Sequence, residues 1–193
     1  MNCLYCDKMI NHYSLYDLFI EKDLLCSSCR KELNLKLEKF KVEDLDCLCL
    51  YKYDSLFKTL LLQYKECYDE ALCEVFLYKV ELLIRLKYQG FKVVYAPSSE
   101  EKRNKRGFDH LKLIFDRLGF ETVSVNKRHE YIQEGKNLNE RKQMIDNYYY
   151  EGSHIDKLLI VDDVCTTGST LLGIYKAFLG KADTIKALVL AKV

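Results

Sequence analysis

The segment 158–170 constrains the fold more than any other part of this sequence. It begins with the apolar run Leu-Leu-Ile-Val, continues with Asp162 and Asp163, and ends with Thr-Thr-Gly-Ser-Thr. Apolar residues resume at Leu171. This order predicts a buried strand, a short turn rich in hydroxyl groups, and the start of a helix.

The turn of this segment carries the groups that bind a phosphate. The first backbone N–H groups of a helix have no partner within the helix, and they lie at the positive end of its dipole. Hydroxyl side chains add donors, and a glycine lets the backbone approach a ligand closely. We therefore expect a phosphate site at Thr166, Thr167, Gly168, Ser169 and Thr170.

The two acids before the turn require a different partner, because carboxylates and phosphates repel each other. Asp162 and Asp163 would accept hydrogen bonds from the vicinal hydroxyls of a ribose, with Mg2+ close by. The alternative is that Asp163 or a threonine only caps a helix. Capping explains one residue, whereas the segment combines two acids, four hydroxyls and a glycine.

The rest of the chain alternates between strand and helix patterns. Apolar residues recur at helical spacing between Leu72 and Leu86 and predict a helix over about 69–88. Further patterns predict strands over 93–96, 122–125, 157–161 and 185–191, and helices over 111–118 and 170–179. This alternation predicts an α/β fold with a mainly parallel sheet flanked by helices, in which ligands bind at the carboxyl ends of the strands.

Four cysteines near the N-terminus have the spacing of a metal site. Two Cys-x-x-Cys pairs are separated by 19 residues and consist of Cys3, Cys6, Cys26 and Cys29. Two such pairs complete a closed tetrahedral shell of sulfur, which is typical of structural zinc. We expect residues 1–50 to form a small zinc-binding module and residues 51–193 to form the main domain, with the metal supplying much of the module's folding energy.

The other cysteines are interpreted without a metal. Cys47 and Cys49 form a Cys-x-Cys pair that we interpret as buried small side chains, although a second ion held with His12 is an alternative. Nine cysteines with no apolar region behind basic N-terminal residues favour a cytoplasmic chain with reduced thiols. No apolar run approaches the roughly 20 residues that a membrane span needs.

Charge is distributed unevenly along the chain. The net charge of +1 excludes a uniformly basic nucleic-acid binder. Residues 85–142, however, carry 14 Lys and Arg against 8 Asp and Glu. A basic middle region suits anionic ligands, whether nucleotide phosphates or nucleic acid.

The segment 158–170 resembles the phosphoribosyl-diphosphate signature of type I phosphoribosyltransferases. That signature has four apolar residues, two acids, two apolar residues and Thr-Thr-Gly-x-Thr, and all thirteen positions fit if Cys165 counts as apolar. Together with the four-cysteine module, the chain resembles the ComF family of competence proteins, in particular its ComFC type. The resemblance extends over nearly the whole chain.

Three other family motifs are matched in part. The Lys-aromatic-x-Gly-Asp stretch is met by Lys65 and Asp69, with Tyr68 where glycine is usual. The Pro-x-Pro strand end is met by Pro97, with Tyr95 at the first proline. The Arg-Gly-Phe-Asn-Gln segment corresponds to 106–110, where Asp109 and His110 replace the two amide residues. The downstream glutamine and arginine are met by Gln133 and Arg141, and Met144 replaces the expected asparagine.

The resemblance implies a site for phosphoribosyl diphosphate and Mg2+. Its pyrophosphate would bind at Pro97, Ser98 and Ser99, under a closing loop that carries Lys102, Arg103, Lys105 and Arg106. In an active transferase, Asp162, Asp163, Arg106 and Arg141 would be the catalytic residues, with the arginines stabilising the leaving pyrophosphate. No acceptor base or amine is identified by the sequence, and no residue stands out as a general base.

The family also implies partners. ComF relatives act in natural transformation, the uptake of single-stranded DNA, beside a helicase-like competence protein and recombination mediators. The alternative to a transferase-like protein is a non-catalytic, zinc-stabilised adaptor that binds single-stranded DNA or docks a partner. In that case the basic region would follow the DNA backbone, and tyrosines such as Tyr88, Tyr95 and Tyr131 would stack on bases.

Overall fold

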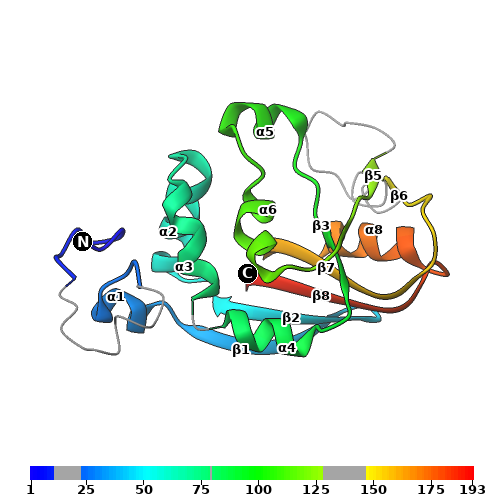
Figure 1. Cartoon of the computed structure of the whole chain (residues 1–193), viewed down its shortest axis with the longest axis horizontal. Helices are drawn as coiled ribbons and strands as arrows, with labels where there is room; N and C mark the ends of the chain where they lie inside the picture. The colour runs from blue at the N-terminus through cyan, green and yellow to red at the C-terminus, as the bar shows by residue number, and fades with distance from the viewer. Residues whose placement is uncertain (11–22, 79, 128–146) are drawn as a thin grey trace.

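A six-stranded sheet in the order β1-β2-β8-β7-β3-β4 forms the centre of the molecule (Figure 1). The computed structural model describes residues 1–10, 23–78, 80–127 and 147–193. β1 pairs with β2 antiparallel, and every other neighbouring pair in this sheet is parallel. The expected α/β fold with a mainly parallel sheet is therefore confirmed. The strands are β1 (Leu35–Val42), β2 (Leu45–Lys52), β3 (Lys92–Tyr95), β4 (Thr122–Val123), β7 (Ile155–Cys165) and β8 (Ala182–Lys192), with β5 (Asn126–Lys127) and β6 (Tyr148–Tyr149) in a separate pair.

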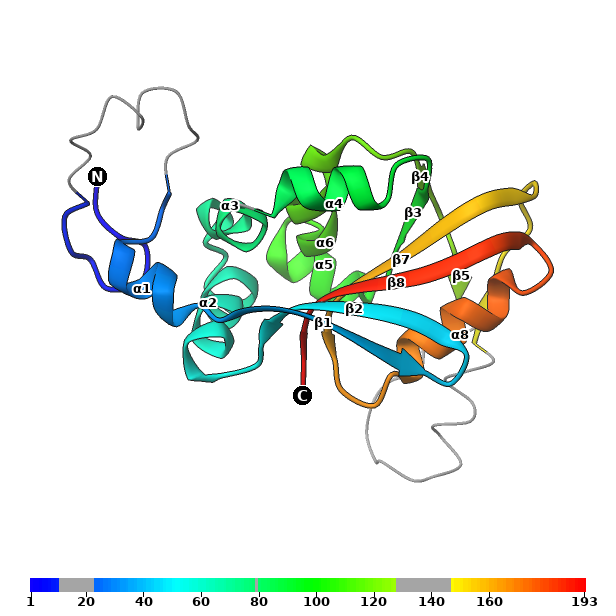
Figure 2. The same cartoon turned by 90° about the horizontal axis from the view of Figure 1, so that it is seen from below.

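Helices cover both faces of the sheet. Figure 2 shows α3, α4 and α6 on one face and α8 on the other. The helices are α1 (Ser27–Glu32), α2 (Ser55–Glu66), α3 (Cys73–Leu77), α4 (Glu81–Lys87), α5 (Glu100–Arg106), α6 (His110–Phe115) and α8 (Ser169–Phe178). Among the described residues, no helix is long and apolar enough to cross a membrane.

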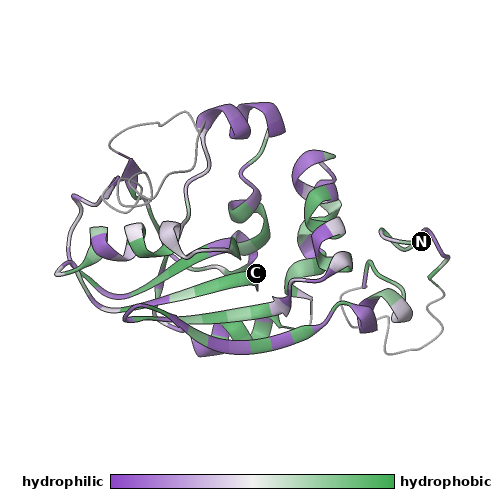
Figure 3. Ribbon diagram, turned by 180° about the vertical axis from the view of Figure 1, so that it is seen from behind, coloured by the Kyte–Doolittle hydropathy of each residue, from purple (hydrophilic) through white to green (hydrophobic). Residues whose placement is uncertain are grey.

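The central strands are buried on both faces, as continuous apolar runs in parallel sheets usually are. In β7, Leu158, Leu159 and Ile160 are fully buried, and β8 contains a similar run at 187–191. Figure 3 shows these strands as hydrophobic, whereas α5 at the rim is hydrophilic. The apolar strand predicted before the two acids is thus the middle of the sheet.

The single helix predicted over 69–88 is wrong. The chain forms α3 and α4 there, and the backbone at Tyr78 leaves the helical region with ψ of 129°. In α4 only Ile84 is buried, while Leu82, Leu83 and Leu86 are exposed. The apolar spacing over 69–88 therefore combined buried residues of α3 with exposed leucines of α4. Spacing alone does not show which apolar side chains are buried.

The sheet also includes residues that were assigned to the zinc module. β1 and β2 cover residues 35–52, and β2 pairs with β8 in the middle of the sheet. Cys47 and Cys49 are buried in β2, where their thiols donate to the carbonyls of Leu45 and Tyr51. Their interpretation as buried side chains is confirmed, and the division of the chain at residue 50 stays a prediction.

Strands β3 and β7 are adjacent, but the chain leaves them in opposite directions. The crossover from β7 through α8 leads to β8 on one side, and the crossover from β3 through α5 and α6 leads to β4 on the other. The backbone N–H of Ala96 donates to the carbonyl of Val161 at 2.9 Å, so the two strand ends lie together. Ligands in open α/β sheets bind in the crevice beyond the carboxyl ends of two such strands.

Candidate ligand site at the ends of β3 and β7

The turn between β7 and α8 presents unpaired backbone donors. The N–H groups of Thr166 and Thr167 donate to no acceptor among the described residues, whereas that of Gly168 donates to the Cys165 sulfur. Ser169 N–H makes one long contact of 3.4 Å with Thr167 Oγ1. Because α8 begins at Ser169 without a side-chain cap, its first amides are available to an anion.

Gly168 is required by its own geometry. Its φ of +77° lies in the left-handed region, and a Cβ at this position would lie 2.7 Å from Cγ1 of Val42, at the end of β1. From the sequence we expected this glycine to allow close approach of a ligand. The structure shows that it permits close packing of the turn against the β1–β2 hairpin.

Asp163 is buried and paired with two side chains. Its Oδ2 accepts from Lys65 Nζ at 2.6 Å and lies 2.5 Å from Nε2 of His110. The Nδ1 atom of His110 lies 3.3 Å from the hydroxyl of Ser98. A chain of polar contacts thus joins the end of α2, the segment after β3, the start of α6 and the end of β7.

Asp162 is half-buried, and its hydrogen-bond partner differs from those of Asp163. Its Oδ1 accepts from the backbone N–H of Asp163 at 2.8 Å. Neither its Oδ2 nor Oδ1 of Asp163 accepts a hydrogen bond from the part of the chain that the structure describes. Each carboxylate therefore keeps one oxygen for a ligand.

The two acids are held in different protonation states. Burial raises the pKa of Asp162 to about 8, and the charge of Asp163 adds to this effect. Burial opposes ionisation of Asp163 as well, but the hydrogen bond from His110 and the charge of Lys65 outweigh it and lower the pKa of Asp163. Asp163 is consequently the fixed negative charge of the site, and Asp162 is the group that a cation would ionise.

The residues expected in a closing loop form helix α5. Ser99 caps its start by accepting from Lys102 N–H at 3.3 Å, and Gly107 ends it in the left-handed conformation. Arg106 is buried, and its Nε donates to the carbonyl of Lys65 at 2.9 Å. The arginine is thereby fixed against the end of α2, next to the residue that pairs with Asp163.

Two departures from the family motifs have a local explanation. Asp109 accepts from the backbone N–H groups of Leu111 and Lys112 and so caps α6, a role open to aspartate as well as asparagine. Tyr68 takes a φ of +60°, the left-handed conformation that suits the usual glycine at this position.

Not every residue predicted for the site can be located in the structure, and burial excludes one of the tyrosines predicted to stack on bases. Arg141, Gln133, Met144 and Tyr131 lie outside the described residues. Pro97, Ser98 and Ser99 follow β3 after Ala96, and Ser98 reaches Asp163 through His110; their role at a pyrophosphate stays a prediction. Tyr88 is buried, so it is unavailable for stacking on a base, and Tyr95 donates its hydroxyl to Asp116 at 2.9 Å.

The four N-terminal cysteines converge on one point. Their sulfur atoms all lie within 4.8 Å of one another, and Cys6 and Cys26 are 3.6 Å apart. A tetrahedral zinc–thiolate site with bonds of about 2.3 Å has sulfur atoms about 3.8 Å apart. Burial alone would raise the pKa of Cys3, but backbone N–H groups of Cys26, Cys6 and Tyr5 lower it to about 7, whereas burial and the neighbouring thiols raise the pKa of Cys29. The cluster is therefore able to hold a metal ion such as zinc.

Known proteins give a consistent picture. The chain is 26% identical over 199 residues to the competence protein ComFC of Streptococcus pneumoniae (strain ATCC BAA-255 / R6), and the match covers 89% of this chain and 90% of that protein. The chain is a homologue of ComFC. No family model matches the sequence.

The solved structures that align with the chain include phosphoribosyltransferases. A hypoxanthine phosphoribosyltransferase from Staphylococcus aureus is 16% identical, with a TM-score of 0.37, and the match covers 66% of this ComFC homologue and 65% of that chain. Adenine phosphoribosyltransferase from Saccharomyces cerevisiae is also 16% identical, with a TM-score of 0.36, over 86% and 89% of the two chains. At TM-scores below 0.5 these likenesses are no basis for assigning a ligand.

Proposed function

We propose that this ComFC homologue binds phosphoribosyl diphosphate with Mg2+ at the ends of β3 and β7 and takes part in natural transformation. The observation that supports this most is the pair of free backbone donors at Thr166 and Thr167, which follow two acids with unpaired oxygens after two intervening residues. This arrangement lies where the crossovers of the sheet diverge. The ComFC relative supports the role in competence.

Each part of the ligand would have its own partners. The 5-phosphate would bind the N–H groups and hydroxyls of 166–170, and the ribose diol would donate to the free oxygens of Asp162 and Asp163. Carboxylate oxygens are suitable ligands for Mg2+, which would neutralise charge on the pyrophosphate at Pro97–Ser99. Transfer to an acceptor would break the bond between ribose C1 and the pyrophosphate oxygen and form a bond from C1 to the acceptor. The protein would contribute position and charge, with Arg106 held in place by the carbonyl of Lys65.

Calorimetric titration of phosphoribosyl diphosphate with Mg2+ tests the proposal. Asp162→Asn keeps an oxygen for the N–H of Asp163 but removes the ionisable group, so we expect about tenfold weaker binding. Asp156→Asn is the matched control, because Asp156 is exposed at the other end of β7. Asp163→Ala is a poor test, since it also leaves Lys65 without its partner. Absence of binding to the wild type, or equal loss in both asparagine variants, would overturn the proposal.

Binding of single-stranded DNA is a second candidate function. Helix α5 carries the exposed cations Lys102, Arg103 and Lys105, which suit a phosphate backbone. We expect binding to oligothymidylate that weakens steeply with salt, is reduced by Arg103→Gln and is unchanged by Asp162→Asn. Fluorescence anisotropy with a labelled oligonucleotide measures it, and affinity that is independent of salt would contradict it.

We also propose that the four-cysteine cluster holds one structural zinc ion. All four ligands belong to the protein, so the shell has no open position for chemistry. Metal analysis of protein purified without chelator is expected to find one zinc per chain. Protein that folds fully with no bound metal would contradict this assignment.

A further inference from the structure

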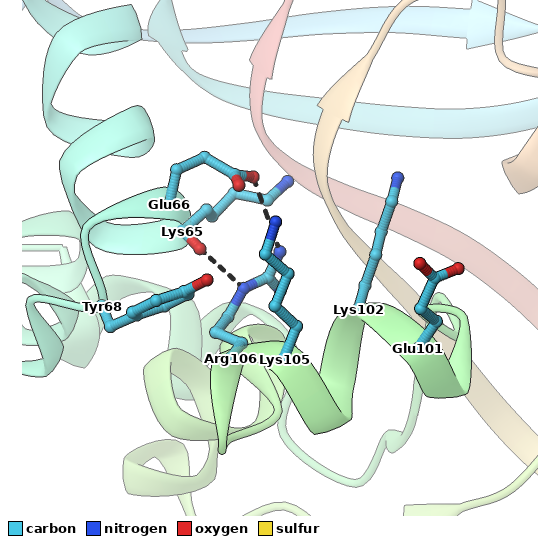
Figure 4. Close-up of a pocket in the computed structure, with 7 residues that line it drawn as sticks. All are labelled: Lys65, Glu66, Tyr68, Glu101, Lys102, Lys105 and Arg106. Atoms are coloured by element: carbon cyan, nitrogen blue, oxygen red, sulfur yellow. Dashed lines mark hydrogen bonds and ion pairs between the residues drawn. The ribbon is translucent and has the colours of Figure 1, made fainter.

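We propose that a pocket between α2 and α5 binds a flat, negatively charged small molecule, which would be the acceptor beside the phosphoribosyl site. The acceptor role rests on the proposed function, whereas binding of the anion in the pocket does not. Figure 4 shows the pocket, a cavity of about 180 Å³ lined by Lys65, Glu66, Tyr68, Glu101, Lys102, Lys105 and Arg106. Pockets for drug-sized ligands have volumes of about 300–1,000 Å³, so this smaller cavity suits a ligand of one ring with one charged group.

The lining of the pocket has surplus positive charge. It contains four cationic side chains and two carboxylates. Lys65 is paired with Asp163, and Arg106 lies 3.9 Å from Glu66. Lys102 and Lys105 form no ion pair with any residue that the structure describes. Two ammonium groups are thus available to an anion.

Arg106 supplies a second, independent observation. Its side chain is only 4% exposed, and its Nη1 is buried with no acceptor among the described residues. Buried donors are nearly always paired, because an unpaired one loses its hydration without compensation. An anionic oxygen entering the pocket beside Arg106 would give this guanidinium the acceptor that the protein does not provide.

Tyr68 indicates a flat ligand. Its φ of +60° is a conformation that costs energy for a residue with a Cβ, and such strain gathers at ligand sites. The side chain is 40% exposed and lines the cavity opposite the lysines of α5, as Figure 4 shows. Its ring therefore offers a face on which a planar group can stack.

The pocket is also next to the acids of the proposed phosphoribosyl site. Lys65 belongs to its lining and contacts Asp163 at 2.6 Å. A ligand held there would lie on the α2 side of the ribose position. This placement is why we assign the pocket to an acceptor and not to a remote effector.

Three small probes test the proposal on the full-length, zinc-loaded protein. Benzoate is flat and charged, cyclohexanecarboxylate is charged but not flat, and benzamide is flat but neutral. Chemical-shift titration is expected to show that benzoate binds more tightly than both other probes. The double variant Lys102→Gln/Lys105→Gln should weaken benzoate by about tenfold. Tyr68→Gly should reduce benzoate affinity to that of cyclohexanecarboxylate.

Arg103→Gln is the matched control. It removes a positive charge from the same helix but lies outside the pocket lining, so benzoate affinity should change by less than twofold. An equal effect of Arg103→Gln would mean attraction by general charge and would overturn the proposal. Benzoate binding no better than benzamide would overturn it too.

The same titration distinguishes the two proposals. If benzoate competes with phosphoribosyl diphosphate, the pocket belongs to the diphosphate end of that ligand, and the acceptor assignment fails while the proposed function stands. If benzoate binds as expected but phosphoribosyl diphosphate does not bind, the proposed function fails and the pocket remains an anion site. Binding of both ligands together supports both proposals.

Discussion

Asp162 and Asp163 are adjacent in the sequence, yet their surroundings give them different properties. Asp163 is surrounded by Lys65 and His110, whereas Asp162 is desolvated and next to a negative charge. The sequence predicted an acidic pair but not this division, because the partners are 98 and 53 residues away along the chain. Spacing in a sequence carries no signal for contacts of that range. The resemblance to ComF proteins marked Lys65 and His110 as motif positions but did not pair them with Asp163.

Asp162 should make stability depend on pH. Its pKa is about 8 in the folded chain against 3.8 for a free side chain, so between these values the folded state holds a proton that the unfolded state has released. Stability at this site therefore falls as pH rises from about 4 to 8. We expect the wild type to lose more stability than Asp162→Asn between pH 5 and pH 8 in urea unfolding without Mg2+. The Asp156→Asn control should follow the wild type, and identical pH dependence in all three proteins would contradict the raised pKa.

Gly168→Ala should cost more stability than an alanine at Gly180. Both glycines flank α8 with positive φ, but only Gly168 faces a neighbour, Val42, that a Cβ would meet. The unfavourable φ costs about 1–2 kcal/mol at either position. Overpacking against Val42 should add about 1–3 kcal/mol at Gly168. Urea unfolding measures the stability of both variants. Equal losses of stability would show that a Cβ at position 168 does not clash with Val42 of the β1–β2 hairpin.

Tyr68→Gly should raise stability. Relief of the left-handed strain is worth about 1 kcal/mol, and the exposed ring forfeits little packing. The denaturation midpoint in urea is the measurement. A decrease in stability would mean that the ring contributes contacts that outweigh the strain.

At the scale of elements, the sequence predicted the helices and strands that have a local apolar pattern or turn motif, and it missed those that depend on tertiary contacts. The strand and helix on either side of the acids, β7 and α8, follow from apolar runs and a turn motif, so their position was predicted within a few residues. Helix α5 was missed because it has no apolar stripe, although Ser99 and Gly107 are cap signals that mark its ends. β2 was missed because residues 1–50 were assigned to the zinc module, whereas β2 pairs with β8 within the main sheet.

Removal of zinc should unfold the N-terminal element and leave the sheet intact. The module is joined to the main body through Arg30, which pairs with Asp23 at 2.6 Å and donates to the carbonyl of Val75 at 3.1 Å. Its own apolar surface is small, so the metal should supply most of its stability. Hydrogen exchange after chelation should show lost protection in residues 1–10 and 23–33 and retained protection in β7 and β8. Cys6→Ser should reproduce the loss, while Cys67→Ser, at an exposed cysteine outside the cluster, should bind zinc normally.

At the scale of the molecule, the features of the site lie together beyond the carboxyl ends of β3 and β7. The free amides before α8, the acids of β7, the end of β3 and the pocket at α2 and α5 are joined through Lys65, Asp163, His110 and Ser98. The four-cysteine module lies at the far end of the molecule, next to α2 (Figure 1). The sequence predicted the class of fold and the phosphate turn, whereas the pocket depends on how α2 and α5 pack and had no local signal.

The most direct test of the central claim is an amide-resolved NMR titration with phosphoribosyl diphosphate and Mg2+. If the turn after β7 binds the 5-phosphate, the amide signals of Thr166 and Thr167 should shift most, because their N–H groups gain acceptors. Ribose 5-phosphate alone should shift the same signals. Shifts confined to other parts of the chain, or none at saturating ligand, would contradict the account.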